Sequence, residues 1–214
     1  MTGESSHPHT HKPVGGFWAD ESGASLVEFA LVITLFLFLL LAIIDFGRIG
    51  HAWVGANKAT QLAARVAAVR PPACPGLPLL NLRGNSGSPP AFGALCRAGS
   101  GVCANPGIIT CPGSAANATA LEIFTAVRPL IPAQTTIGQM RYSYTFDPNL
   151  GFLGGPYVPM VTVEFTSVNF TFISQLGVFF PALTGQSSTL GTPISLPGMS
   201  VSLPAEDLAL GTAG

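Results

Sequence analysis

The sequence predicts an α+β protein, in which a long N-terminal transmembrane helix continues into an extracytoplasmic domain with a short helix on a small antiparallel sheet. Three observations support this fold class. An apolar run from Ala24 to Ile44 is long enough to cross a membrane, an alanine-rich run extends it without proline to Val69, and apolar residues alternate with polar ones in the C-terminal half. The expected units are a prepilin-type leader (1–23), the helix (24–70), a Cys/Pro/Gly-rich loop segment (71–115) and the small α+β domain (116–214).

Composition excludes several classes of protein. Of 214 residues only 9% are charged, 48% are hydrophobic, and the net charge is -1. A disordered polyelectrolyte would be more charged, and a nucleic-acid-binding protein would present a basic face. We therefore expect a membrane-anchored protein with a modest folded domain and no nucleic-acid partner.

The apolar run contains one ionisable side chain, Glu28, between Ala24 and Ile44. At a rise of about 1.5 Å per residue, its length matches the roughly 30 Å hydrocarbon core of a bilayer. A cleaved signal peptide is the competing interpretation, but its apolar region would be shorter and closely followed by a small-residue cleavage site. A single transmembrane helix fits better.

Charges and cysteines give conflicting indications of orientation. One basic residue, Lys12, precedes the helix, against Arg48, Lys58 and Arg65 after it, so the positive-inside rule alone places the C-terminal part in the cytoplasm. The Pro/Gly-rich segment holds an even number of cysteines whose spacing lacks a zinc knuckle and favours disulfides in an oxidising compartment. We give the cysteines more weight than the basic residues and expect the C-terminal domain to be extracytoplasmic. Three disulfide pairings are possible among the four cysteines, Cys74, Cys96, Cys103 and Cys111.

Small residues recur at every fourth position after the apolar run. The row that begins at Gly55 allows another helix to approach closely in a membrane. Alternatively, alanine is simply a good helix former and the row packs on the protein's own domain. Both interpretations apply to Gly55, Ala59, Ala63 and Ala67.

Local patterns after residue 116 predict one helix and three strands. Thr119 to Glu122 has the form of a capping box and begins a short amphipathic helix that ends before Pro129. Alternation predicts strands at 140–146 and 161–172, the second with a β-bulge at Thr166–Ser167 because its apolar phase shifts by one residue. A terminal strand is expected at 199–203.

No constellation of residues predicts catalysis. The four histidines lie at positions 7, 9, 11 and 51, so a nucleophile after Arg70 would have no histidine base. The alternating N-terminal histidines fit a flexible polar tail better than a metal site. We expect a non-enzymatic protein with no cofactor and no metal.

Two polar features interrupt the long helix. Asp45 and Arg48, three positions apart at the end of the apolar run, predict an interfacial ion pair. Glu28 admits two interpretations: a capping box with Ser25, or a carboxylate that needs a cation because burial at mid-membrane costs roughly 2.5 to 3.5 kcal/mol. A cut after Gly23 would supply that cation as the amine of Ala24.

These residues together resemble a known family. Gly23 followed by ASLVEF, the long apolar helix, DFGR at 45–48 and the alanine-rich continuation are similar to the TadE-like proteins, pseudopilins of tight-adherence (Flp) pilus assembly. The resemblance implies cleavage by a prepilin peptidase between Gly23 and Ala24, and an assembly role for Glu28. It also implies a single-pass protein of the bacterial inner membrane, whose partners are the lipid bilayer, other pilin-like subunits and the pilus assembly machinery.

Two features qualify this resemblance. The leader ends in Asp20–Glu21 where such leaders usually carry basic residues, and the Cys-rich segment departs from the family pattern. The rival hypothesis is a membrane-anchored extracytoplasmic binding or adhesin module with no pilus role. In that case the helix serves only as an anchor and residues 1–23 are retained.

Overall fold

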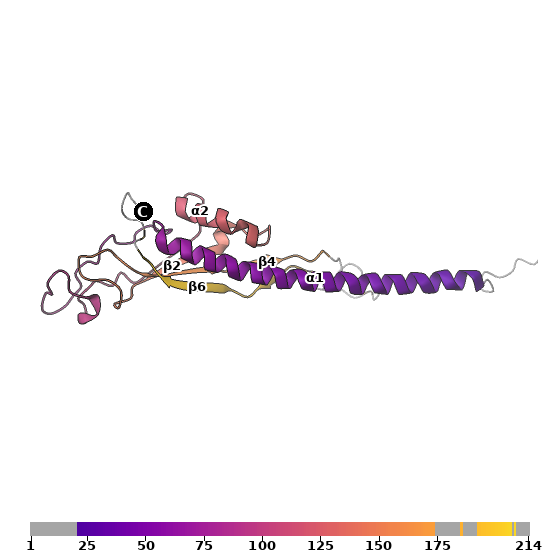
Figure 1. Cartoon of the computed structure of the whole chain (residues 1–214), viewed down its shortest axis with the longest axis horizontal. Helices are drawn as coiled ribbons and strands as arrows, with labels where there is room; N and C mark the ends of the chain where they lie inside the picture. Colours follow the sequence, from indigo (N-terminus) through magenta and orange to yellow (C-terminus); the bar gives the residue numbers. More distant parts are fainter. Residues whose placement is uncertain (1–20, 174–184, 186–191, 207, 209–214) are drawn as a thin grey trace, which may run out of the picture. The chain divides into compact units, whose positions relative to one another are not determined.

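The computed structural model describes residues 21–173, 185, 192–206 and 208, with side chains described from residue 23. Helix α1 runs over Glu21–Val69 (Figure 1). The chain divides into two compact units, Met1–Ile44 and Asp45–Gly214, so this helix contributes to both. The predicted leader up to residue 20, with its three histidines, lies outside the described residues.

In the first unit, the described residues form the N-terminal part of α1. The segment is apolar and long enough to cross a membrane, and none of its most apolar window is buried against protein. The predicted capping box at Ser25 is wrong, because α1 begins at Glu21 and Ser25 already lies inside the helix. The residues between Glu21 and Ser25 include no proline, and Gly23 lowers helix stability by only about 1 kcal/mol, so the helix can begin before Ser25.

The second unit is built on a four-stranded antiparallel sheet in the order β1-β2-β3-β6. The short helix α2 spans Ala118–Val127, and a second, two-stranded sheet pairs β4 with β5. This is the predicted α+β architecture. The strands are β1 Ile108–Pro112, β2 Met140–Thr145, β3 Met160–Phe165, β4 Val168–Phe170, β5 Ile194–Leu196 and β6 Met199–Pro204.

The core of the second unit lies between the sheet and the C-terminal part of α1. Alternate residues of β2 and β3 point inward, among them the fully buried Tyr142, Tyr144 and Val163. They share one apolar cluster with Ala59 and Ala63 of α1, as well as with residues of α2. The alternation that predicted the strands therefore marks the face that α1 and α2 cover.

Two local predictions are corrected by the structure. The phase change after Phe165 is no bulge: the chain leaves the four-stranded sheet there, and Val168 begins β4 in the other sheet. Helix α2 is capped by Asn117, whose side chain accepts a hydrogen bond from the Ala120 amide at 2.9 Å. Asparagine is among the best N-cap residues, and Glu122 instead pairs with Arg70 at 3.0 Å.

Two disulfides lie within the Cys-rich segment. Cys74, just beyond α1, bonds to Cys111 of β1, and Cys96 bonds to Cys103. The prediction of disulfides is thus confirmed, and one of the three pairings is selected. Strand β1 was missed, because the whole segment was expected to consist of loops.

Candidate functional site

The Gly23–Ala24 peptide bond lies in the first turn of α1. A Cβ added to Gly23 would meet no other atom within 4 Å, and Ala24 is exposed. Backbone amides in a first helical turn have no intrahelical acceptors, and a glycine there weakens the helix by about 0.5–1 kcal/mol relative to alanine. The bond is therefore exposed on the surface of the helix.

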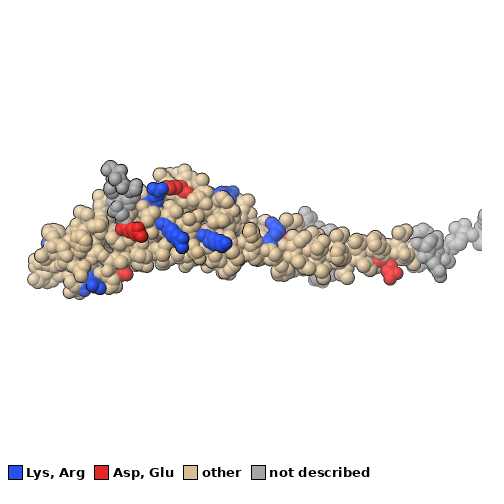
Figure 2. Space-filling model, in the orientation of Figure 1, with Lys and Arg blue, Asp and Glu red and all other residues tan. Residues whose placement is uncertain are grey.

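Glu28 lies one turn beyond Ala24 on the same face of the helix. Side chains four positions apart in an α-helix are neighbours, so an amine at Ala24 would lie within reach of the Glu28 carboxylate. The surrounding surface is apolar: Leu26, Val27 and Phe29 are 72%, 63% and 65% exposed. Figure 2 shows this part of the helix as uncharged surface with one acidic patch. The arrangement isolates one carboxylate on a surface suited to lipid or to other apolar helices.

Asp45 forms a buried polar junction where the apolar run ends. The residue is only 2% exposed, and its Oδ1 accepts a hydrogen bond from Arg48 at 2.9 Å. The same oxygen accepts the backbone N–H of Ile173 at 3.1 Å. The Asp45–Arg48 pair was expected from spacing, whereas the third partner, 128 positions away, had no signal in the sequence.

Arg48 also contacts the end of β4. Its guanidinium lies 5.1 Å from the centre of the Phe170 ring, a geometry that favours a cation–π interaction. Phe170 in turn packs edge-on against Phe172, with the ring centres 5.5 Å apart. The junction therefore joins α1 to the short sheet through both a carboxylate and an aromatic pair.

The small-residue row packs inside the protein's own domain. Ala59, Ala63 and Ala67 are fully buried, and a Cβ on Gly55 would collide with the backbone oxygen of Leu130. The row lets the helix backbone approach the sheet and the segment after α2. The structure supports the interpretation that the row packs on the protein's own domain. In this fold a second helix cannot reach Gly55, Ala59, Ala63 and Ala67.

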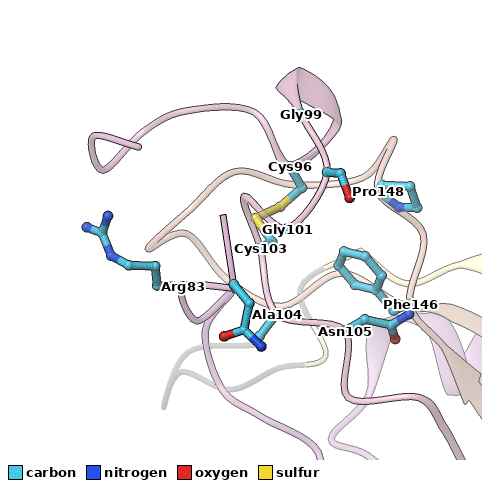
Figure 3. A pocket seen from close by; sticks show the side chains of 12 residues that line it. Arg83, Cys96, Gly99, Gly101, Cys103, Ala104, Asn105, Phe146 and Pro148 are labelled. Atoms are coloured by element: carbon cyan, nitrogen blue, oxygen red, sulfur yellow. A yellow bond between two sulfur atoms is a disulfide. The ribbon is translucent and has the colours of Figure 1, made fainter. Parts of the chain in front are cut away.

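A cavity of about 600 Å³ lies beside the Cys96–Cys103 disulfide (Figure 3). Polar groups of Asn85, Ser100 and Asn105 line it together with Phe146. Arg83 also belongs to the lining, but its guanidinium bonds to the carbonyl of Pro90 and stacks 5.0 Å from the Phe92 ring. The described lining thus offers amides and a hydroxyl without an acid–base pair, an arrangement unsuited to acid–base catalysis.

Comparison with known families identifies the N-terminal segment. Residues 23–65 match the model of the TadE-like protein family, so the resemblance found in the sequence is confirmed over this stretch. Searches of curated proteins and of solved structures return no significant match. The chain therefore combines a TadE-like segment, a helix able to span a membrane, and a C-terminal α+β domain.

Proposed function

We propose that this chain is a TadE-like pilus assembly protein, a pseudopilin or minor pilin, that takes part in the biogenesis of a tight-adherence type IV-like pilus. The observation that carries the proposal is the family match, which begins at Gly23 and includes Glu28, Asp45 and Arg48. The exposed apolar surface around Glu28 supports it, because assembly of pilin-like subunits needs a helix that is free to meet its neighbours.

In this proposal a prepilin peptidase cuts between Gly23 and Ala24 in the bacterial inner membrane. The new amine of Ala24, or that of a neighbouring subunit, then pairs with Glu28. An uncompensated carboxylate within hydrocarbon is costly, so the charge pair would favour one axial register between adjacent helices. The role requires no catalysis by this chain.

The proposed orientation places the domain outside the cytoplasm. The disulfides Cys74–Cys111 and Cys96–Cys103 support it, because such bonds persist in oxidising compartments. The three basic residues after the apolar run oppose it by the positive-inside rule alone. Arg48, however, is paired with Asp45, which reduces its weight as a free cytoplasmic charge.

The test is Glu28→Gln in the native host, with pili counted by microscopy. We expect membrane insertion to be intact and piliation to fall sharply, because glutamine keeps the size of the side chain but loses its charge. Glu122→Gln is the matched control, since it makes the same change at an exposed carboxylate of the domain. Normal piliation in the Glu28→Gln strain would refute the assembly role.

A further inference from the structure

The end of the two-stranded sheet lies beside Asp45. Strand β4 ends at Phe170, and three residues later the Ile173 amide donates to Asp45, the residue that directly follows Ile44. If the run from Ala24 to Ile44 fills the hydrocarbon core, Asp45 lies at the membrane surface, and its hydrogen bond holds Ile173 at the same level.

Two apolar side chains at this end of the sheet are exposed. Ile173 is 63% exposed and Ile194, which pairs with the end of β4 through Phe170, is 38% exposed. Phe46, the helix residue next to Asp45, is 74% exposed. Isolated exposed apolar residues are ordinary, but Ile173 is bonded to Asp45, Phe46 directly follows it, and Ile194 pairs with the ring residue that Arg48 contacts.

The polar groups at the same place fit a membrane surface. The Asp45 carboxylate receives one bond from a guanidinium and one from a backbone amide, which compensates its burial. Arg48 lies over an aromatic ring while its side chain stays 39% exposed, so its stem packs on the protein and its charge can meet the headgroups.

We infer that this end of the β4–β5 sheet is a second membrane contact, at which Ile173 and Ile194 enter the interfacial layer of the bilayer. The inference rests on the membrane span of the proposed function. It assigns to Asp45 and Arg48 the role of positioning the sheet at the membrane surface.

The experiment uses the full chain in phospholipid vesicles and a single tryptophan as a depth probe. In a Trp18→Phe, Trp53→Phe background, Ile173→Trp and Ile194→Trp report on the proposed contact through quenching by lipids brominated close to the headgroup. Ile108→Trp is the matched control: this isoleucine is 69% exposed and lies at the opposite end of the four-stranded sheet from Phe165, the residue that leads to β4. Phe36→Trp reports on the helix itself through lipids brominated deep in the acyl chains, because position 36 lies near the middle of the run from Ala24 to Ile44.

We expect brominated lipid to quench the probes at 173 and 194 and to blue-shift their emission, while the probe at 108 keeps its full emission. If the probe at 36 is quenched but those at 173 and 194 behave like the probe at 108, the second contact is wrong and the membrane span stands. If the probe at 36 is also unquenched, the membrane span fails as well. Two reporters, one after β4 and one on β5, keep the test valid should one substitution prevent folding.

Discussion

The two parts of α1 have opposite surfaces. Before Asp45 the helix presents large aliphatic and aromatic side chains, of which Leu35 is 70% exposed. After Asp45 the face that packs on the domain consists mainly of alanines, of which Ala63 is fully buried. Side-chain size distinguishes them: large chains expose area to an apolar solvent, whereas small ones let a helix backbone approach a sheet.

The contrast also explains why a charge is tolerated differently in each part. Glu28 stands on an exposed apolar surface, where a cation from outside the helix would compensate its charge. Asp45 is buried but already has two donors within 3.1 Å. The first carboxylate is the one to which we assign the proposed assembly role, and the second holds one chain together.

Removing the disulfide at the end of α1 is expected to have the largest effect. Cys74–Cys111 spans 37 positions, so the chain-entropy model predicts that replacing both cysteines by serine lowers the free energy of unfolding by about 4 kcal/mol. The same change at Cys96 and Cys103, 7 positions apart, should cost about 2.5 kcal/mol. Denaturant unfolding of the detergent-solubilised protein measures both; a larger loss for the shorter loop would contradict the model.

Enlarging the alanine face is the next effect in size. Ala63→Leu adds volume to a fully packed site and should lower the free energy of unfolding of the domain by about 1–3 kcal/mol. Gln61→Leu is the control, because it introduces the same residue on the exposed face of the same helix. Equal stability of the two variants would mean that the alanine row does not pack on the sheet.

Alkaline pH should destabilise the packing of α1 on the four-stranded sheet, because Tyr142 and Tyr144 lie in the same apolar cluster as the alanine row. Burial raises the pKa of Tyr142 and Tyr144 above the ordinary value of about 10, and a backbone hydrogen bond from Ala73 only partly offsets this for the Tyr144 pKa. Because the folded-state pKa values are raised, the stability is fully present below about pH 10 and is lost as pH rises above it. The midpoint of thermal unfolding should fall between about pH 9 and about pH 11, and less steeply in Tyr142→Phe; equal slopes would contradict this assignment.

The surface ion pair at the end of α1 should matter least. Arg70 and Glu122 are 3.0 Å apart, but their side chains are 46% and 49% exposed. Exposed pairs of this kind contribute about 0–1 kcal/mol. Glu122→Gln should therefore leave the unfolding midpoint almost unchanged, and a loss as large as that of Ala63→Leu would show that charge, and not packing, holds α1 on the domain.

Sequence patterns predicted those elements whose burial is periodic. The alternation at 140–145 and 160–165 is the alternation of buried and exposed residues in β2 and β3. Strand β1 was missed because it is a short edge strand with no fully buried residue, and it ends in Pro112. Proline donates no backbone hydrogen bond, so its presence in a sequence favours the prediction of a loop, although an edge strand can accommodate it.

Long-range contacts were beyond local patterns. The spacing of Asp45 and Arg48 predicted their ion pair, but the Ile173 amide reaches Asp45 only because β4 leaves the main sheet after Phe165. The same change of sheet was mistaken for a bulge, because both arrangements shift the apolar phase by one residue. Small residues at a spacing of four likewise fit a partner helix or the protein's own sheet, and only the fold distinguishes them.

The proposal that α1 is the helix of a processed pilin-like subunit is tested most directly at its N-terminus. The measurement is the N-terminal sequence, with the intact mass, of the protein extracted from the membranes of its native host. A mature chain that begins at Ala24 is the predicted result and would make Glu28 the neighbour of a new amine. A mature chain that begins at Met1 would contradict the account and favour a simple membrane-anchored module.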